Sequence, residues 1–240
     1  MANNNNNNDI VGQTVQLLAC ELKGHHRAYQ PSIFKVPTEL IDISPESYIP
    51  QVVSIGPLHR AATHVQAFEA RKATYLNDLL GWLDLPHEPT LEECVQKVTG
   101  SINYIKQSYN EMVSYTDVEL AHMMVMDGFF ILEFIYKVKD KDIDSFLGES
   151  IMKDLLKLEN QIPFFVLQDL FDCTILKCRP SASLTDLVLD ALQVVSIFVQ
   201  DPRNEIDIPR PGTTPDHILG LLHTKKIYSI RILKFTNLQC

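Results

Sequence analysis

The sequence is poor in glycine and lacks the motifs that mark common catalytic sites. Its 240 residues include 9 glycines and 13 prolines, which disfavours an all-β fold with many tight turns and suits helices separated by proline-marked loops. No G-x-S-x-G, G-x-x-x-x-G-K-[ST] or G-x-G-x-x-G sequence occurs, so neither a nucleophile elbow nor a phosphate-binding loop is indicated. These absences do not exclude an enzyme, but they leave no specific reaction to propose.

Basic residues and paired cysteines are also scarce. The sequence has 21 Lys and Arg residues and 30 Asp and Glu residues, which gives a net charge of −9. Because this is a poor electrostatic match for a phosphate backbone, we do not expect nucleic acid as a partner. The cysteines number five, only Cys173 and Cys178 lie near each other, and no CxxC or HExxH spacing occurs. We therefore expect free thiols in a reducing compartment, without a metal or another cofactor.

The beginning of the sequence has no signal-peptide pattern, and no apolar run reads as a membrane span. Two residues and then six asparagines stand where a signal peptide needs a basic and then an apolar region. The most apolar long stretch, Val118–Tyr136, contains four polar or charged residues. A mid-span aspartate costs about 2.5–3.5 kcal/mol on insertion scales, so a buried helix is the better interpretation. We expect a cytoplasmic protein that is not secreted, with the periphery of the plasma membrane as an open alternative.

The distribution of prolines and apolar residues predicts a mostly α fold. We expect an irregular multi-helix domain with an extended proline-rich N-terminal segment and little or no β structure. The predicted boundaries are a disordered asparagine-rich tail over 1–9, a helical domain over 10–199, a proline-rich linker over 200–215, and a short helix with an atypical tail over 216–240.

Local signals place the elements within this outline. Five prolines between residues 31 and 60 exclude a long helix there, and Val52–Ile55 is the best candidate for a short strand, before a turn at Gly56 and Pro57. Apolar spacing predicts a short helix over 10–23 and five longer ones. The longer ones are expected over 66–83, 90–113, 116–138, 151–162 and 183–199, and a short last helix is expected over 215–223 with Thr214 as its cap. Three of the starts (Thr90, Thr116 and Ser183) have an acidic residue three positions on, as in a capping box.

Asp127 is the most notable polar residue because it lies among Met and Phe side chains on the apolar helix. If it is buried, its carboxylate needs hydrogen bonds or a cationic partner. One interpretation is a structural acid that ties its helix to a loop, and the other is a general acid with a raised pKa. No nearby Ser, Cys or His suggests a reaction, which favours the structural interpretation.

A second polar group lies beside a proline in the stretch LENQIPFF, residues 158–165. Pro163 has no N–H, so a helix that continued through it would leave the carbonyl of Glu159 without a partner. Asn160 and Gln161 are suited to bind backbone groups that such a break sets free. We expect a kink or helix junction there, while a ligand-binding polar cluster is the alternative.

Three stretches of the chain together resemble one plant family. They are IFKVP (33–37) with YIPQVVSIGPLH (48–59), then DGFFILE (127–133), and then the segment from Asp154 through LENQIPFFVL (158–167). Their order and spacing are similar to those of the domain of unknown function 247 proteins, and PDHIL (215–219) resembles a short motif that follows. The residues that carry the resemblance, and that we expect to be structural, are Pro37, Tyr48, Pro50, Ser54, Gly56, Pro57, His59, Asp127, Gly128, Glu159, Asn160, Gln161 and Pro163.

The resemblance implies no catalytic, cofactor-binding or metal-binding residue, since none is assigned in that family. Its members are usually longer and commonly end in a transmembrane helix, so the chain resembles a truncated member that covers the N-terminal half. Some grass members are associated with pollen self-incompatibility, which suggests a non-enzymatic protein-interaction or signalling module with an unknown protein partner. Two alternatives remain: an enzyme of unknown class that uses a buried Asp127, and a non-functional truncation product.

Overall fold

The computed structural model describes residues 31–111, 114–194 and 215–224, all within the compact unit formed by residues 31–240. The prediction of a mostly α fold is confirmed, because the named elements in these ranges are helices. The only β pairing there is an isolated parallel bridge between Ile33 and Tyr109. The predicted tail over 1–9, the helix over 10–23 and almost all of the linker over 200–215 lie outside the described residues.

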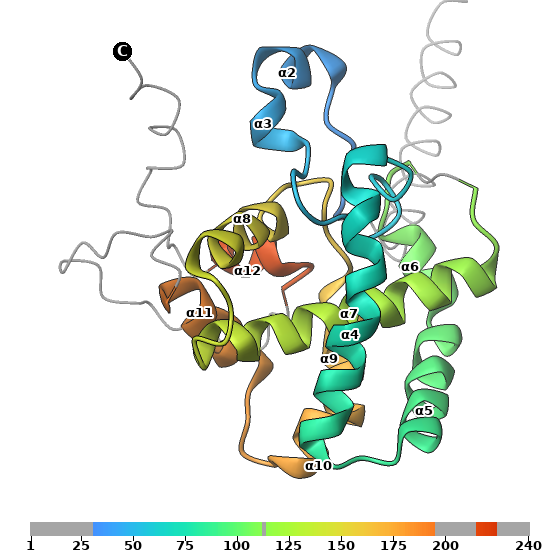
Figure 1. Cartoon of the computed structure of the whole chain (residues 1–240). Coiled ribbons are helices and arrows are strands. Elements are labelled where there is room, and N and C mark those ends of the chain that lie inside the picture. Colours follow the sequence, from blue (N-terminus) through green and yellow to red (C-terminus); the bar gives the residue numbers. More distant parts are fainter. Residues whose placement is uncertain (1–30, 112–113, 195–214, 225–240) are drawn as a thin grey trace, which may run out of the picture. The chain divides into compact units, whose positions relative to one another are not determined.

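The longest described helix, α7 (Asp117–Lys139), runs through the middle of the unit (Figure 1). Sixteen of its 23 residues are buried, and they include Phe129, Phe130 and Phe134. A helix that is apolar on nearly all sides is stable only when other elements surround it. The helices packed against it are α4 (Gln66–Leu83), α5 (His87–Gly100), α6 (Ile102–Gln107), α9 (Phe164–Cys173) and α11 (Leu184–Val194). The buried helix predicted over 116–138 is therefore confirmed.

Two of the three predicted helix caps form. The Thr116 hydroxyl accepts from the Glu119 N–H at 3.2 Å, and the Glu119 carboxylate accepts from the Thr116 N–H at 2.8 Å. At the start of α11, the Ser183 hydroxyl accepts from the Asp186 N–H at 3.3 Å. The predicted start at Thr90 is wrong. Helix α5 begins three residues earlier, directly after a proline, and the Thr90 N–H donates to that proline's carbonyl.

The helix predicted over 90–113 is in fact two helices. Helix α5 ends at Gly100, and α6 begins after Ser101. Glycine is a weak helix former, which suits it to this break. After α6, the Ser108 carbonyl accepts from the N–H groups of Ser32 and Ile33 at 3.0 and 2.9 Å. A contact with a segment some 75 residues away along the chain therefore ends the helical stretch.

The proline-rich segment contains two short helices that the sequence analysis did not predict. Helix α2 (Thr38–Ile43) follows Pro37, and α3 (Pro45–Tyr48) begins with a proline, which is favoured at a first helical position. Neither helix has a buried residue. The strand predicted at Val52–Ile55 does not form, and a 3₁₀ turn (Thr63–Val65) leads into α4.

The remaining helices also differ from the prediction at their ends. Helix α8 (Ser145–Leu155) stops seven residues before the predicted end, so the stretch before Pro163 is a turn between α8 and α9. A short helix, α10 (Ile175–Cys178), follows α9. Helix α12 (Ile218–Thr224) begins three residues later than predicted, and the ring of His217 accepts from the N–H of Gly220 at 2.9 Å. His217 thus takes the capping role predicted for Thr214, a residue outside the described ranges.

Candidate functional site

Asp127 is fully buried in α7 and is bound by a cation and a backbone amide. Its Oδ1 lies 2.5 Å from Nζ of Lys72, and its Oδ2 accepts from the Gly56 N–H at 2.7 Å. Lys72, on α4, is itself fully buried; its Nζ donates to the Ser54 carbonyl at 2.6 Å and lies 2.8 Å from Glu69. The carboxylate therefore has both kinds of partner that its burial demands.

A second cation completes this group. Arg60 pairs with Glu69 and lies 3.6 Å from Asp127. Two carboxylates and two cations thus form one cluster in which Lys72 and Asp127 are buried and Arg60 and Glu69 are partly exposed, and their formal charges cancel. The Ser54 hydroxyl is buried beside them without a hydrogen-bond partner among the described residues. A compensated cluster of this kind is costly to break, because removing one member leaves another charge unpaired.

Glu159 joins two ends of the proline-rich segment to the turn after α8. One of its oxygens accepts from the Val36 N–H, and the other lies 2.9 Å from Nε2 of His59. Burial lowers the pKa of His59, while the neighbouring Glu159 charge opposes that shift. Both side chains are nearly buried, so the pair connects chain segments rather than facing solvent.

Asp154 binds three consecutive amides of the proline-rich segment. Its carboxylate accepts from the N–H groups of Gln51, Val52 and Val53 at 2.9, 2.6 and 3.0 Å. It also accepts from Nζ of Lys157 at 2.9 Å. Because a side chain takes up these amides, they are not free to pair with another strand, which explains why the predicted strand is absent.

Asn160 continues the same contact. Its Oδ1 accepts from the Ile55 N–H at 2.7 Å, and its Nδ2 donates to the carbonyls of Val53 and Asp154, both at 3.0 Å. The amide group thus acts as a donor and an acceptor toward the proline-rich segment. Through its hydrogen bond to the Asp154 carbonyl, it also binds the last turn of α8.

Gln161 binds the turn from within. Its Nε2 donates to the carbonyls of Leu155 and Lys157 at 2.6 and 2.9 Å, and its Oε1 accepts from the Leu219 N–H at 3.3 Å. Pro163 stands directly before α9 as its N-cap residue. Gln161 thus binds carbonyls at and just after the end of α8, which stabilises the junction between α8 and α9.

Both glycines of the motifs lie where a side chain would collide. Gly56 has φ of +72°, and a Cβ added there would lie 2.5 Å from the carbonyl oxygen of Gln161. A Cβ on Gly128 would lie 2.2 Å from Cδ1 of Leu170. The first glycine permits a turn that other residues disfavour, and the second lets α9 pack closely on α7.

Three of the four motif prolines are buried, namely Pro50, Pro57 and Pro163. Pro50 and Pro57 offer carbonyls that accept from the His64 ring at 2.7 Å and from the Tyr115 hydroxyl at 3.4 Å. The other two motif residues of this segment flank the short helices: Pro37 is exposed before α2, and Tyr48 is half-buried at the end of α3. These four residues therefore do not share one environment.

We call the set of Lys72, Asp127, Asp154, Glu159, Asn160 and Gln161, with the backbone of residues 50–60, the polar junction. Sequence analysis named four of its side chains and missed Lys72 and Asp154. Asp154 could have been found, because it opens the third motif stretch, five residues before Glu159. No local signal marks Lys72, since a lysine on an amphipathic helix is expected at the surface.

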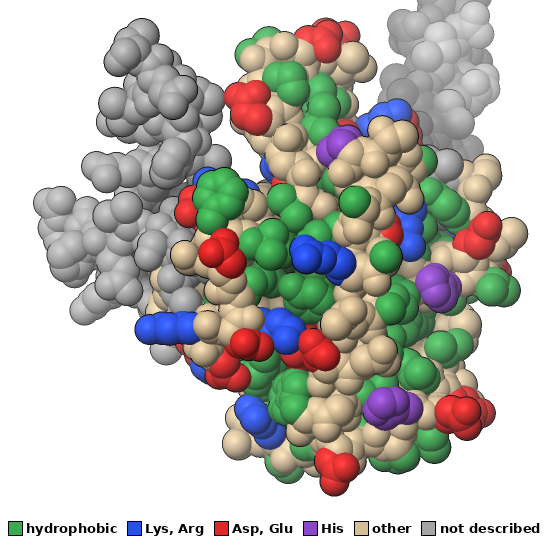
Figure 2. All heavy atoms as spheres, viewed as in Figure 1, with side chains coloured by type: hydrophobic (Ala, Val, Ile, Leu, Met, Phe, Trp, Pro, Cys, Tyr) green, Lys and Arg blue, Asp and Glu red, His purple; other side chains and the backbone are tan. Residues whose placement is uncertain are grey.

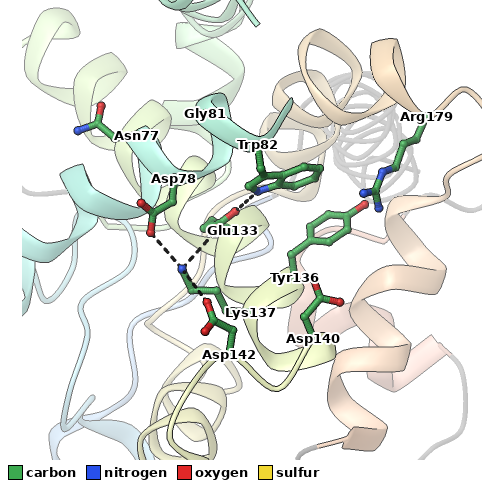
Figure 3. Close-up of a pocket in the computed structure, with 10 residues that line it drawn as sticks. All are labelled: Asn77, Asp78, Gly81, Trp82, Glu133, Tyr136, Lys137, Asp140, Asp142 and Arg179. Atoms are coloured by element: carbon green, nitrogen blue, oxygen red, sulfur yellow. Dashed lines mark hydrogen bonds and ion pairs between the residues drawn. The ribbon is translucent and has the colours of Figure 1, made fainter. Parts of the chain in front are cut away.

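Two open hollows lie apart from the polar junction. They measure about 720 and 540 Å³, and neither is lined by Asp127, Glu159 or His59. In the larger one, shown in Figure 3, Glu133 accepts from the Trp82 indole N–H at 2.7 Å. Burial raises the pKa of Glu133, which that hydrogen bond and the charge of Lys137 oppose. Across the described ranges, no three His, Cys, Asp or Glu side chains are grouped so that they could hold a metal ion.

Fold and site together define a class of protein: a helical unit in which acidic and amide side chains of a helix junction bind a proline-rich segment. The chain belongs to the DUF247 family, described as plant protein of unknown function, whose family model matches residues 33–231. The resemblance seen in the sequence is thereby confirmed.

Two curated relatives from Arabidopsis thaliana are similar to part of the chain. UPF0481 protein At3g47200 is 37% identical over 150 residues, which cover 58% of this chain and 30% of that protein. Putative UPF0481 protein At3g02645 is 26% identical over 165 residues, which cover 67% of this chain and 30% of that protein. The chain therefore matches less than a third of the length of these relatives. No solved structure matches it.

Proposed function

We propose that this unit is a non-enzymatic protein-interaction module that acts in signalling or cell recognition. The internal pairing of the motif side chains supports this proposal. Asp127 and Glu159 bind backbone amides and buried or nearly buried cationic or imidazole partners. Groups engaged in this way hold chain segments together, and a general acid or base must instead reach a substrate proton.

The surface of the proline-rich segment also supports an interaction role. Helices α2 and α3 bury no residue, and Ile43 is 80% exposed. Figure 2 shows hydrophobic side chains beside acidic ones on this part of the molecule. Such a short, ordered projection gives a partner apolar contacts without rearrangement of the core.

The location of the protein belongs to the same proposal. In the described parts of the chain, no helix has the length and apolar character that crossing a membrane requires. We propose a cytoplasmic module, with association at the plasma-membrane periphery as the second candidate.

Substitution of Asp127 tests whether this residue is structural or catalytic. Asp127→Asn keeps an acceptor for the Gly56 N–H but leaves Lys72 with less compensating charge. Because removing one partner of a buried ion pair typically costs 3–5 kcal/mol, we expect the free energy of unfolding in urea to fall by about 3 kcal/mol. If Asp127 is instead a catalytic acid, the free energy of unfolding should stay unchanged or rise, because replacing a catalytic residue in a strained site usually has that effect.

A matched control lies at the start of α7. Asp117 is also 2.5 Å from a lysine, Lys106, but both side chains are exposed. Asp117→Asn should cost at most about 1 kcal/mol, because exposed ion pairs contribute little. If Asp127→Asn is as stable as the unsubstituted protein or as Asp117→Asn, the structural interpretation of Asp127 is wrong. That result would favour the hypothesis that Asp127 is a catalytic residue.

A further inference from the structure

The two hollows adjoin each other and are not used by the polar junction. Tyr136 of α7 and Arg179, which follows α10, line both of them. The larger hollow extends toward α4, and the smaller one extends along the start of α11. Together they form one depression that reaches from α4 across Tyr136 of α7 to the start of α11, which gives room for a segment of a polypeptide chain.

An aromatic shelf at the centre of this depression already holds a guanidinium group. The rings of Trp82 and Tyr136 have centroids 4.8 Å apart. The guanidinium carbon of Arg179 lies 4.9 Å from the centroid of the Trp82 ring and 5.2 Å from that of the Tyr136 ring. Figure 3 shows the three side chains on one side of the larger hollow. Both distances fall within the range of a cation–π contact, so the shelf can accept an arginine.

Negative charge outnumbers positive charge around the shelf. Three cations, Lys137, Lys139 and Arg179, line the two hollows. The carboxylates that line them number six: Asp78, Glu133, Asp140, Asp142, Asp186 and Asp190.

The existing ion pairs do not use all of these carboxylates. Lys137 pairs with three of them, and Lys139 pairs with Asp190. Asp140 and Asp186 are exposed and have no ion-pair partner in the part of the chain that the structure describes. The depression thus offers unpaired carboxylates close to a guanidinium-binding surface.

We propose that this depression binds an arginine-bearing segment of a partner protein. A guanidinium of the partner takes the place of Arg179 on the shelf of Trp82 and Tyr136, and further basic side chains pair with Asp140 and Asp186. Arginine is favoured over lysine because its flat guanidinium stacks on aromatic rings and binds carboxylates through two N–H groups. This inference rests on the proposed interaction function and names the chemistry of the partner.

The chain carries its own reporter for this site. Trp82 is the only tryptophan of the chain and is 38% exposed, so its fluorescence reports directly on the shelf. We would titrate the whole chain with a short capped peptide of alternating arginine and glycine. We expect a saturable change of the Trp82 emission that weakens as salt rises from about 0.05 to 0.3 M, because screening shortens the reach of exposed charges.

Two further peptides separate shape from charge. The same peptide with citrulline, which is nearly isosteric with arginine but uncharged, should not bind. The lysine version should bind several-fold more weakly, since an ammonium group stacks less well. Equal binding of the arginine and lysine peptides would refute guanidinium recognition, and binding of the citrulline peptide would refute the charge argument.

Variants of the chain test the direction of the effect. Asp140→Asn combined with Asp186→Asn should weaken arginine-peptide binding by about threefold to tenfold at low salt, as expected for exposed pairs. Arg179→Gln should strengthen it, because a competing cation leaves the shelf. Asp42→Asn, at an exposed position of α2 away from both hollows, should leave binding unchanged.

Opposite results would overturn the proposal. Weaker binding of the arginine peptide by Arg179→Gln would refute the exchange of guanidinium groups on the shelf. Saturable binding of a glutamate peptide would identify an anion-binding surface instead. No response of Trp82 to the arginine peptide would rule out this site, and Asp127→Asn would still test the proposed function separately through the stability of the unit.

Discussion

Asp154 offers a direct test of how the helix junction binds the proline-rich segment. Its carboxylate accepts from three consecutive amides, those of Gln51, Val52 and Val53. Asp154→Ala removes the acceptor of all three N–H groups at once. The neighbouring Lys157 loses one partner but keeps the carbonyl of Ile49, which accepts from its Nζ at 2.6 Å.

The expected loss follows from the exposure of those amides. Gln51 is exposed, so water can replace the lost bond there, while Val53 is buried and Val52 is half-buried. A hydrogen bond to a charged group contributes about 1.5–3 kcal/mol, and two such bonds without replacement give an expected loss of about 3–5 kcal/mol. At a urea m-value of about 2–3 kcal/mol/M, the unfolding midpoint falls by roughly 1–2.5 M.

A second aspartate provides the matched control. Asp144 caps α8 and accepts from a single backbone amide, that of Leu147, at 3.0 Å in an exposed position. Asp144→Ala should therefore cost about 1 kcal/mol, the usual value for an N-cap. Both variants would be unfolded in urea and followed by far-ultraviolet circular dichroism and Trp82 fluorescence.

Hydrogen exchange adds a local measurement. The amides of residues 51–53 should lose protection in Asp154→Ala, and they should keep it in Asp144→Ala. If the two variants differ by less than about 1 kcal/mol, or if exchange at 51–53 does not change, the carboxylate does not hold this segment and the reasoning fails.

Two further predictions concern a glycine and a histidine. Gly56→Ala places a Cβ 2.5 Å from a backbone carbonyl at φ of +72° and should lower the free energy of unfolding by more than about 2 kcal/mol. Gly100 has open space around it, so Gly100→Ala should change the free energy of unfolding by less than about 1 kcal/mol or stabilise the helix. Equal effects of Gly56→Ala and Gly100→Ala would contradict the predicted collision at Gly56. Burial lowers the pKa of His217 from 6.5, against the opposing hydrogen bond to Ser32, so its contribution to stability is full above pH 6.5 and is lost as the pH falls through 6.5 toward the lowered value. His217→Asn keeps an acceptor for the Gly220 N–H but does not titrate in this range. Urea midpoints measured from about pH 7.5 to 5.5 should therefore fall less steeply than in the unsubstituted protein. An unchanged slope would show that His217 does not contribute to the pH dependence of stability.

Sequence by itself was sufficient where the cause lies within a few residues. The cap formed by Thr116 and Glu119 joins groups three positions apart, and the buried course of α7 follows from its nearly continuous apolar residues. The family was also evident, because its motifs are contiguous. Amide side chains beside a proline correctly indicated a junction at Asn160 and Gln161.

Tertiary structure decided what those local groups bind. Residues 52–55 read as a strand, yet their conformation depends on Asp154 and Asn160, which lie about a hundred positions further along the chain. Asp127 called for a cation, but only the packing of α4 on α7 identifies that cation as the buried Lys72. Likewise, Trp82 lies on α4, Tyr136 lies on α7 and Arg179 follows α10, and the three carry no common sequence signal. The physical reason is one of range: backbone caps and apolar periodicity act within one or two helical turns, whereas the partner of a buried charge is fixed only when distant segments exclude water together.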